Sequence, residues 1–189
     1  MTEAVDKEYK ERKLREKNIV IHGLREAGSE VKDWTQRNNH DLSKIKELLA
    51  VLETGLTAGD IVHSRRIGKS AGRRPETGPR PLLAMFKTND QQNKMLSKSP
   101  ALATRNDDWK KVKVVPDLTE KQRKEDNAAY ELAKENNEKM SDDDSKNFQW
   151  KVVGQRGYKK AVRARKYDGG AEQPSGDKKQ REKRKKPTD

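Results

Sequence analysis

Four short runs of apolar residues, many of them β-branched, stand out along the chain. They lie at residues 18–24, 60–63, 82–86 and 112–115, and each is bounded by charged residues, glycine or proline. Runs of this length are typical of strands that are buried on at least one face. The strongest pattern is that of the first run, NIVIHGL, which we predict to be the central strand of a small sheet.

Two segments between these runs have the spacing of amphipathic helices. The first ends at Gly55 and has an apolar stripe formed by Trp34, Leu42, Ile45, Leu48, Leu49 and Leu52. The second begins near Thr88, a good N-cap residue, and ends at Pro100. The order of elements predicts an α+β, ferredoxin-like (βαββαβ) domain over residues 18–116, with two helices on one face of a four-stranded antiparallel sheet and an open opposite face.

Three further regions flank this domain. Residues 117–166 predict a small C-terminal unit, in which a helix with a Thr119/Gln122 capping box precedes a hairpin that has Arg156 at its tip. The acidic residues 142–144 are predicted to form a loop between them. Residues 1–17 predict a charged, solvated helical arm, with the stub of a coiled coil as the alternative. The basic tail, residues 167–189, is predicted to be disordered.

Composition narrows the classes of function. The 189 residues are 40% charged and 30% hydrophobic with a net charge of +13, which rules out a large core and favours a polyanionic partner. The sequence contains no apolar stretch long enough to span a membrane, and no cysteine for disulfides or zinc. The three histidines are isolated, and the sequence contains no phosphate-binding loop or nucleophile motif. We therefore predict a non-enzymatic protein without a cofactor or metal.

Cationic residues gather in two segments that predict contacts with phosphate. The first has Glu76 as its one acid and contains Arg65, Arg66, Lys69, Arg73, Arg74 and Arg80. The second has no acid between residues 151 and 166 and contains Arg156, Lys159, Lys160, Arg163 and Arg165. Guanidinium groups match the geometry of phosphate oxygens, so both segments predict binding to nucleic acid. A solvated surface loop is the alternative for the first segment.

Several local sequences resemble a known family. They are KNIVIHGL at 17–24, RRIGK at 65–69, PRPLLAMF at 79–86 and VVPDLT at 114–119, the last followed by a charged helix. Over residues 17–163 they resemble the RNA-recognition-motif-like and C-terminal domains of first-open-reading-frame proteins from LINE-class (non-long-terminal-repeat) retrotransposons. The resemblance implies a protein with chaperone activity that coats the element's RNA in the cytoplasm or nucleus, with Arg123 as an RNA contact. Members often trimerise through an N-terminal coiled coil, so self-association stays open here.

The chain departs from a standard RNA-recognition motif on its sheet. Such motifs stack bases on aromatic residues of the central strands, whereas this chain has Val20, Pro81 and Leu83 there and keeps only Phe86. We therefore predict no base stacking on the open face, and expect the helix that begins at Thr119 to pack against it. The primary prediction is sequence-tolerant binding of single-stranded RNA, with DNA not distinguished. The alternatives are a protein-interaction module and a non-catalytic N-terminal part of a retroelement polyprotein.

Overall fold

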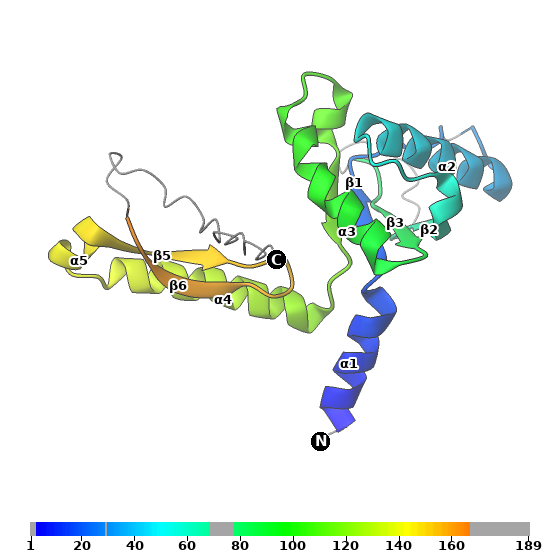
Figure 1. Ribbon diagram of the computed structural model, residues 1–189. Helices are drawn as coiled ribbons and strands as arrows, with labels where there is room; N and C mark the ends of the chain where they lie inside the picture. The colour runs from blue at the N-terminus through cyan, green and yellow to red at the C-terminus, as the bar shows by residue number, and fades with distance from the viewer. Residues whose placement is uncertain (1–2, 29, 69–77, 167–189) are drawn as a thin grey trace, which may run out of the picture. The chain divides into compact units, whose positions relative to one another are not determined.

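The computed structural model describes residues 3–28, 30–68 and 78–166 (Figure 1). Its helices are α1 (Glu3–Arg15), α2 (Trp34–Val51), α3 (Asn89–Lys98), α4 (Glu120–Glu138) and α5 (Asp142–Asn147), with 3₁₀ turns η1 (Ala58–Asp60), η3 (Ser99–Thr104) and η4 (Asp108–Lys111). Its strands are β1 (Asn18–His22), β2 (Ile61–Arg66), β3 (Leu82–Phe86), β4 (Lys113–Pro116), β5 (Phe148–Val153) and β6 (Lys160–Arg165). The predicted tail at 167–189 and most of the first basic loop lie outside the described residues.

The chain divides into two compact units. The first unit runs to Ala128, within α4, and also includes residues 154–159, which connect β5 to β6. The second unit begins at Ala129 and contains the rest of α4, α5 and the two strands of the hairpin. Each unit is described separately below.

The first unit is built on a four-stranded antiparallel sheet with the order β2-β3-β1-β4. β1 is a central strand, as predicted, because it pairs with β3 on one side and β4 on the other. The helices α2 and α3 both contribute to the core on one face of this sheet (Figure 1). The architecture is α+β and compatible with a ferredoxin-like fold.

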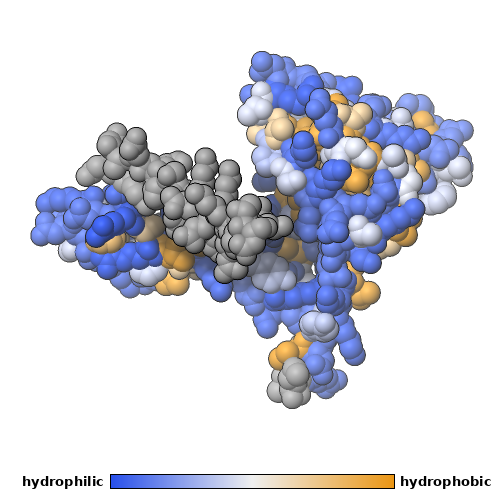
Figure 2. All heavy atoms as spheres, in the orientation of Figure 1, coloured by the Kyte–Doolittle hydropathy of each residue, from blue (hydrophilic) through white to orange (hydrophobic). Residues whose placement is uncertain are grey.

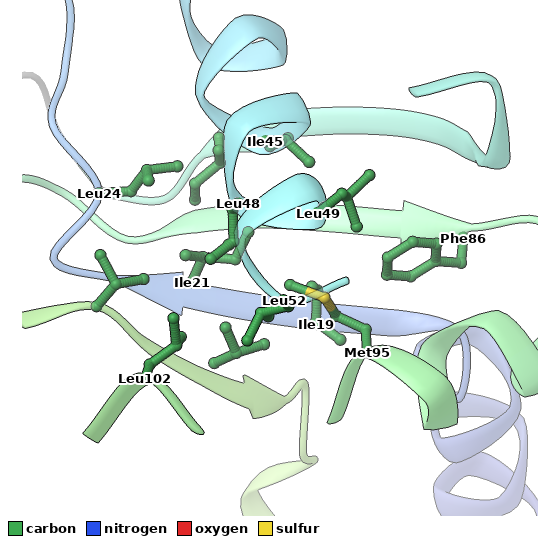
Figure 3. Close-up of a cluster of buried hydrophobic side chains, with 14 residues drawn as sticks. Ile19, Ile21, Leu24, Ile45, Leu48, Leu49, Leu52, Phe86, Met95 and Leu102 are labelled. Atoms are coloured by element: carbon green, nitrogen blue, oxygen red, sulfur yellow. The ribbon is translucent and has the colours of Figure 1, made fainter. Parts of the chain in front are cut away.

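The core of the first unit follows from the alternation of side chains along the strands. Ile19 and Ile21 of β1 are fully buried beneath the helices, whereas His22 is exposed over most of its surface. Ile45 and Leu48 of α2 pack onto these strand residues (Figure 3). The placement of Trp34 in the apolar stripe was wrong, since 73% of it is exposed. Trp34 lies about 16 Å along the helix axis from Ile45, beyond the part of α2 that covers the core.

Two elements differ from the prediction, and two helix caps agree with it. β2 continues to Arg66, so Arg65 and Arg66 lie on a strand and not in a loop. The acidic residues at 142–144 open the short helix α5, because Ser141 caps them with its hydroxyl and acidic residues favour a first helical turn. The predicted N-cap at Thr88 and the predicted capping box of Thr119 with Gln122 are both present, and Thr88 also forms a capping box with Gln91.

The first turns of α4 are tied to α1 and to the turn at residues 154–159. The Thr119 hydroxyl donates to the Glu8 carboxylate (2.7 Å), and Arg12 forms an ion pair with Glu125 (3.0 Å). That this part of α4 covers the open sheet face stays a prediction. Thr119 is buried with its hydroxyl on Glu8 of α1, and a Cβ at Gly157 would lie against Leu118 and Gln122.

In the second unit, β5 and β6 pair in antiparallel register from Phe148–Arg165 to Val153–Lys160. The Asn137 side chain of α4 pairs with the free edge of β5, since its amide accepts from the backbone N–H of Trp150 and donates to the Trp150 carbonyl, both at 2.7 Å. The amide therefore takes the place of a third strand at this position of the sheet edge.

Candidate nucleic-acid interface

An open groove of about 1260 Å³ lies within the first unit, along the edge strand β4. We call it the β4 groove. Its walls come from α1, α3, β4, the first turn of α4 and the turn at residues 154–159. The cations that line it are Arg12, Lys13, Arg15, Lys110, Lys113 and Arg156, against two acids, Glu16 and Asp117. The balance of charge makes the β4 groove basic.

The cations of α1 are engaged in ion pairs. Arg15 bonds to Asp117 (3.0 Å), Lys13 to Glu16 (3.0 Å), and Arg12 to Glu8 and Glu125. Within the part of the chain that the structure describes, Lys110, Lys113 and Arg156 have no carboxylate partner. These three cations therefore contribute most of the uncompensated positive charge of the β4 groove.

The position of Arg156 is set by the turn that carries it. The backbone N–H of Tyr158 donates to the Gln155 carbonyl (3.0 Å), so Arg156 is the second residue of a β-turn and Gly157 the third. Gly157 has a φ of +88°, which suits glycine at this position of a type II turn. The buried carboxylate of Asp126 anchors the turn by accepting from the N–H groups of Gly157 (2.7 Å) and Lys159 (3.1 Å).

The groove also contains aromatic side chains that could stack on bases. Tyr158 is 63% exposed and Tyr9 is 62% exposed. The exposure of Tyr158 favours an accessible ring over one that fills a hairpin core. Trp150, in the second unit, is only half-buried, and its backbone is held by Asn137.

A histidine that does not itself line the β4 groove lies across the β1–β4 pair from one of the groove's cations. His22 is the register partner of Lys113 across the β1–β4 pair. Partial burial of the imidazole, and the charges of Lys113 and Arg156, lower the pKa of His22 below its ordinary value of 6.5. The two cations therefore add to the effect of burial in disfavouring protonation of His22.

The first basic segment is divided by the structure. Arg65 is exposed on the open sheet face, opposite Leu83. Arg66 points to the other face, where its guanidinium pairs with Asp41 at 2.6 Å and only 7% of its side chain is exposed. Arg80 pairs with Glu26 at 2.7 Å. Arg66 and Arg80 thus bind protein groups, while Lys69, Arg73 and Arg74 lie outside the described residues.

The open sheet face presents aliphatic residues. Register places Leu83 opposite Val20, and Val20 opposite Val115, in one row across the sheet. Phe86, the aromatic residue retained from the standard motif, is 1% exposed and belongs to the core on the helical face. The four described strands of this sheet therefore offer no aromatic platform on the open face.

The second unit holds the remaining basic residues of the hairpin. Arg163 stacks on the Phe148 ring, with its guanidinium carbon 4.3 Å from the ring centroid, and pairs with Asp144 at 2.6 Å. Arg165 lies 5.9 Å from the same ring, and Lys160 is exposed. In the first unit, Arg123 is exposed on α4, and Lys159 is half-buried beside the turn.

Sequence reasoning missed Lys110 and Lys113, which line the groove. A search for one-sided basic runs passes over them, because Asp107 and Asp108 precede Lys110 and balance the local charge. The alternation Val112-Lys113-Val114 was the available signal, since it places Lys113 on the face opposite Val114. Figure 2 shows hydrophilic residues over much of the face in view, with apolar residues exposed between them.

Comparisons with known proteins add no assignment: no protein-family model matches the chain, and the search of curated proteins found no significant relative. Among the described residues, no helix has the length and apolar character needed to cross a membrane. The same residues include no group of three or more histidine, aspartate or glutamate side chains placed to hold a metal ion.

Proposed function

We propose that this protein binds single-stranded RNA without enzymatic activity and with little sequence preference. The observation that carries the proposal is a set of three cations, Lys110, Lys113 and Arg156, which have no carboxylate partner among the described residues and line a groove large enough for an extended strand. Cations that no carboxylate neutralises gain most from phosphate, because binding releases the counterions condensed on the nucleic acid.

The proposal of low sequence preference rests on the kind of contacts available. Phosphate contacts position a nucleic acid but do not report its sequence. The open face has the aliphatic residues Val20, Leu83 and Val115 where stacking residues would read bases, which supports binding through the backbone. The exposed rings of Tyr9 and Tyr158 add stacking, which tolerates any base. This mode favours a single strand, whose bases are free to stack.

The proposal extends to the architecture and class of the whole protein. We infer a ferredoxin-like, RNA-recognition-motif-like domain followed by a helix-and-hairpin C-terminal unit, similar to first-open-reading-frame proteins of LINE-class retrotransposons. Such a protein would coat RNA in the cytoplasm or nucleus and act as a chaperone for it. The strand order β2-β3-β1-β4 and the capped helix after β4 support this interpretation.

Fluorescence anisotropy with a labelled single-stranded 30-mer RNA tests the proposed function. The logarithm of the association constant should fall with the logarithm of salt concentration by about 0.7 for each phosphate contact, giving a slope of several units. Matched duplex DNA is the control and should bind more weakly. Absence of binding at low salt would overturn the proposal, and equal, weak binding to both would reduce it to non-specific charge attraction.

A protein-interaction module is the second candidate, and the aliphatic row on the open sheet face favours it. Val20 lies at the centre of that row and Val115 at its end on the edge strand β4, and both are only half-buried. A partner bound there would be held by apolar contacts, which salt does not weaken. Substituting Val20 with Asp should abolish such binding, whereas it should leave a strongly salt-dependent association with RNA through the β4 groove in place.

A further inference from the structure

The local backbone brings the end of β1 against the start of β4. Gly23, which follows His22, has a φ of +78°, and a Cβ at this position would lie 2.3 Å from the Lys111 carbonyl oxygen. This close approach requires glycine and fixes the register of the strand ends. Lys113 is therefore directly opposite His22, with Cβ atoms of such cross-strand pairs about 5 Å apart.

A third basic group comes from a distant part of the chain. Arg156, at the tip of the turn anchored by Asp126, is close enough for its charge to act on His22. Three basic groups thus converge from β1, β4 and the β5–β6 turn. The residues lie 91 and 43 positions apart in sequence, so only the fold assembles them.

The acids around this cluster are already engaged. Asp126 accepts the backbone N–H groups of Gly157 and Lys159, and Asp108 pairs with Lys111 at 3.0 Å. The charged groups that act on His22 are Lys113 and Arg156, and both are positive. Among the described residues the cluster therefore lacks a carboxylate to neutralise it, and a bound anion would relieve the mutual repulsion of its members.

We propose that His22, Lys113 and Arg156 form a binding site for one backbone phosphate of a single-stranded nucleic acid, and that His22 takes up a proton when the phosphate binds. This inference rests on the proposed function and adds a pH dependence to it. Arg156 and Lys113 supply permanent charge, and His22 supplies a third charge when it is protonated.

The sign of the pH dependence follows from linkage. In the free protein, burial and the two cations keep the pKa of His22 low, so the imidazole is neutral near pH 7. A phosphodiester carries a negative charge throughout this range and favours the imidazolium, so the pKa of His22 rises on binding. At a pH between the pKa of His22 in the free protein and its pKa in the complex, binding is accompanied by uptake of a proton. The affinity therefore increases as the pH falls, by at most about tenfold per pH unit.

The test measures the affinity for single-stranded RNA between pH 5.5 and 8 at constant ionic strength. The wild-type protein should bind about 3- to 10-fold more tightly at pH 5.5 than at pH 7.5. His22→Gln should lose most of this increase, because glutamine does not take up a proton in this pH range. His63→Gln is the matched control, since His63 is an exposed histidine on β2, and it should retain the pH dependence.

The outcomes separate the two proposals. If His22→Gln binds RNA with the same pH dependence as the wild-type protein, the phosphate site is wrong and the proposed function stands. If the wild-type protein binds no RNA at any pH, the proposed function fails, and the phosphate site fails with it.

A second measurement needs no variant. Proton NMR of the three histidine rings in the wild-type protein gives each titration midpoint with and without RNA. The His22 midpoint should rise when RNA is added. Inorganic phosphate and polyglutamate are run in parallel. A larger shift with RNA than with either identifies the nucleic-acid backbone as the ligand, and an equal shift with polyglutamate would overturn that choice.

Discussion

At the scale of single residues, two neighbouring arginines on one strand have different structural roles. Arg65 and Arg66 are adjacent on β2, and alternation sends them to opposite faces. Arg66 donates to Asp41 and also to the carbonyl groups of Leu24, Arg25 and Arg80, so it joins the β1 end to the loop before β3. Arg65 remains exposed and available for a ligand.

This difference gives the first prediction. Arg66→Ala should lower the free energy of unfolding by about 3–5 kcal/mol, because it leaves Asp41 buried without its partner. Arg65→Ala should change stability by about 0.5 kcal/mol or less, yet weaken RNA binding. Urea denaturation followed by circular dichroism measures the first effect and anisotropy the second. Equal stability of the two variants would contradict the structural role of Arg66.

Gly157 gives a second prediction at this scale. A Cβ there would lie 2.8 Å from Leu118 Cδ2 and 2.9 Å from Gln122 Nε2, in a backbone with positive φ. Gly157→Ala should cost about 1–3 kcal/mol of stability and weaken RNA binding by displacing Arg156. Gly68→Ala separates strain from collision, since Gly68 has a φ of +91° but open space around it. It should cost about 1 kcal/mol in the same urea titration. A loss from Gly157→Ala no larger than that from Gly68→Ala would show that packing of the turn on α4 is unimportant.

At the scale of elements, α4 stabilises the hairpin of the second unit through one polar side chain. Asn137→Ala removes both hydrogen bonds to the Trp150 backbone and leaves the edge of β5 to water. Because Asn137 is exposed, its two hydrogen bonds contribute modestly, and we expect the free energy of unfolding to fall by about 1–2 kcal/mol. Hydrogen exchange at the Trp150 amide should accelerate by about tenfold or more. Glu138→Ala, at the next exposed position, should leave this exchange rate unchanged, and acceleration there would mean that the end of α4 frays as a whole.

The sequence predicted individual strands and helix caps well, but it did not predict contacts between elements. The strands at 18–24 and 82–86 and the Thr88 and Thr119 caps were predictable because each depends on residues within a few positions. The burial of Arg66 was not, because its partner Asp41 lies 25 positions away on another element. The β4 groove was hidden for the same reason, since Arg156 meets Lys113 only after α4 and the turn are in place. Local patterns cannot encode such distant pairs.

At the scale of the whole molecule, the net charge of +13 is less informative than its pairing. Many basic residues bond to acids, as Arg12, Lys13 and Arg15 do on α1, and these contribute little attraction for an anion. A partner therefore experiences the cations that remain unpaired. Among the residues of the first unit that the structure describes, these include Lys110, Lys113 and Arg156, which all line one groove.

The final prediction compares position with total charge. Replacing Lys110, Lys113 and Arg156 together with alanine should reduce the salt slope of RNA binding by about 2, at about 0.7 per lost phosphate contact. The matched control replaces three lysines that do not line the groove, Lys46, Lys87 and Lys94, and so removes the same net charge. Its slope should change by less than about 0.7. If both triple variants lower the slope equally, the RNA responds to net charge alone, and the β4 groove has no special role in binding.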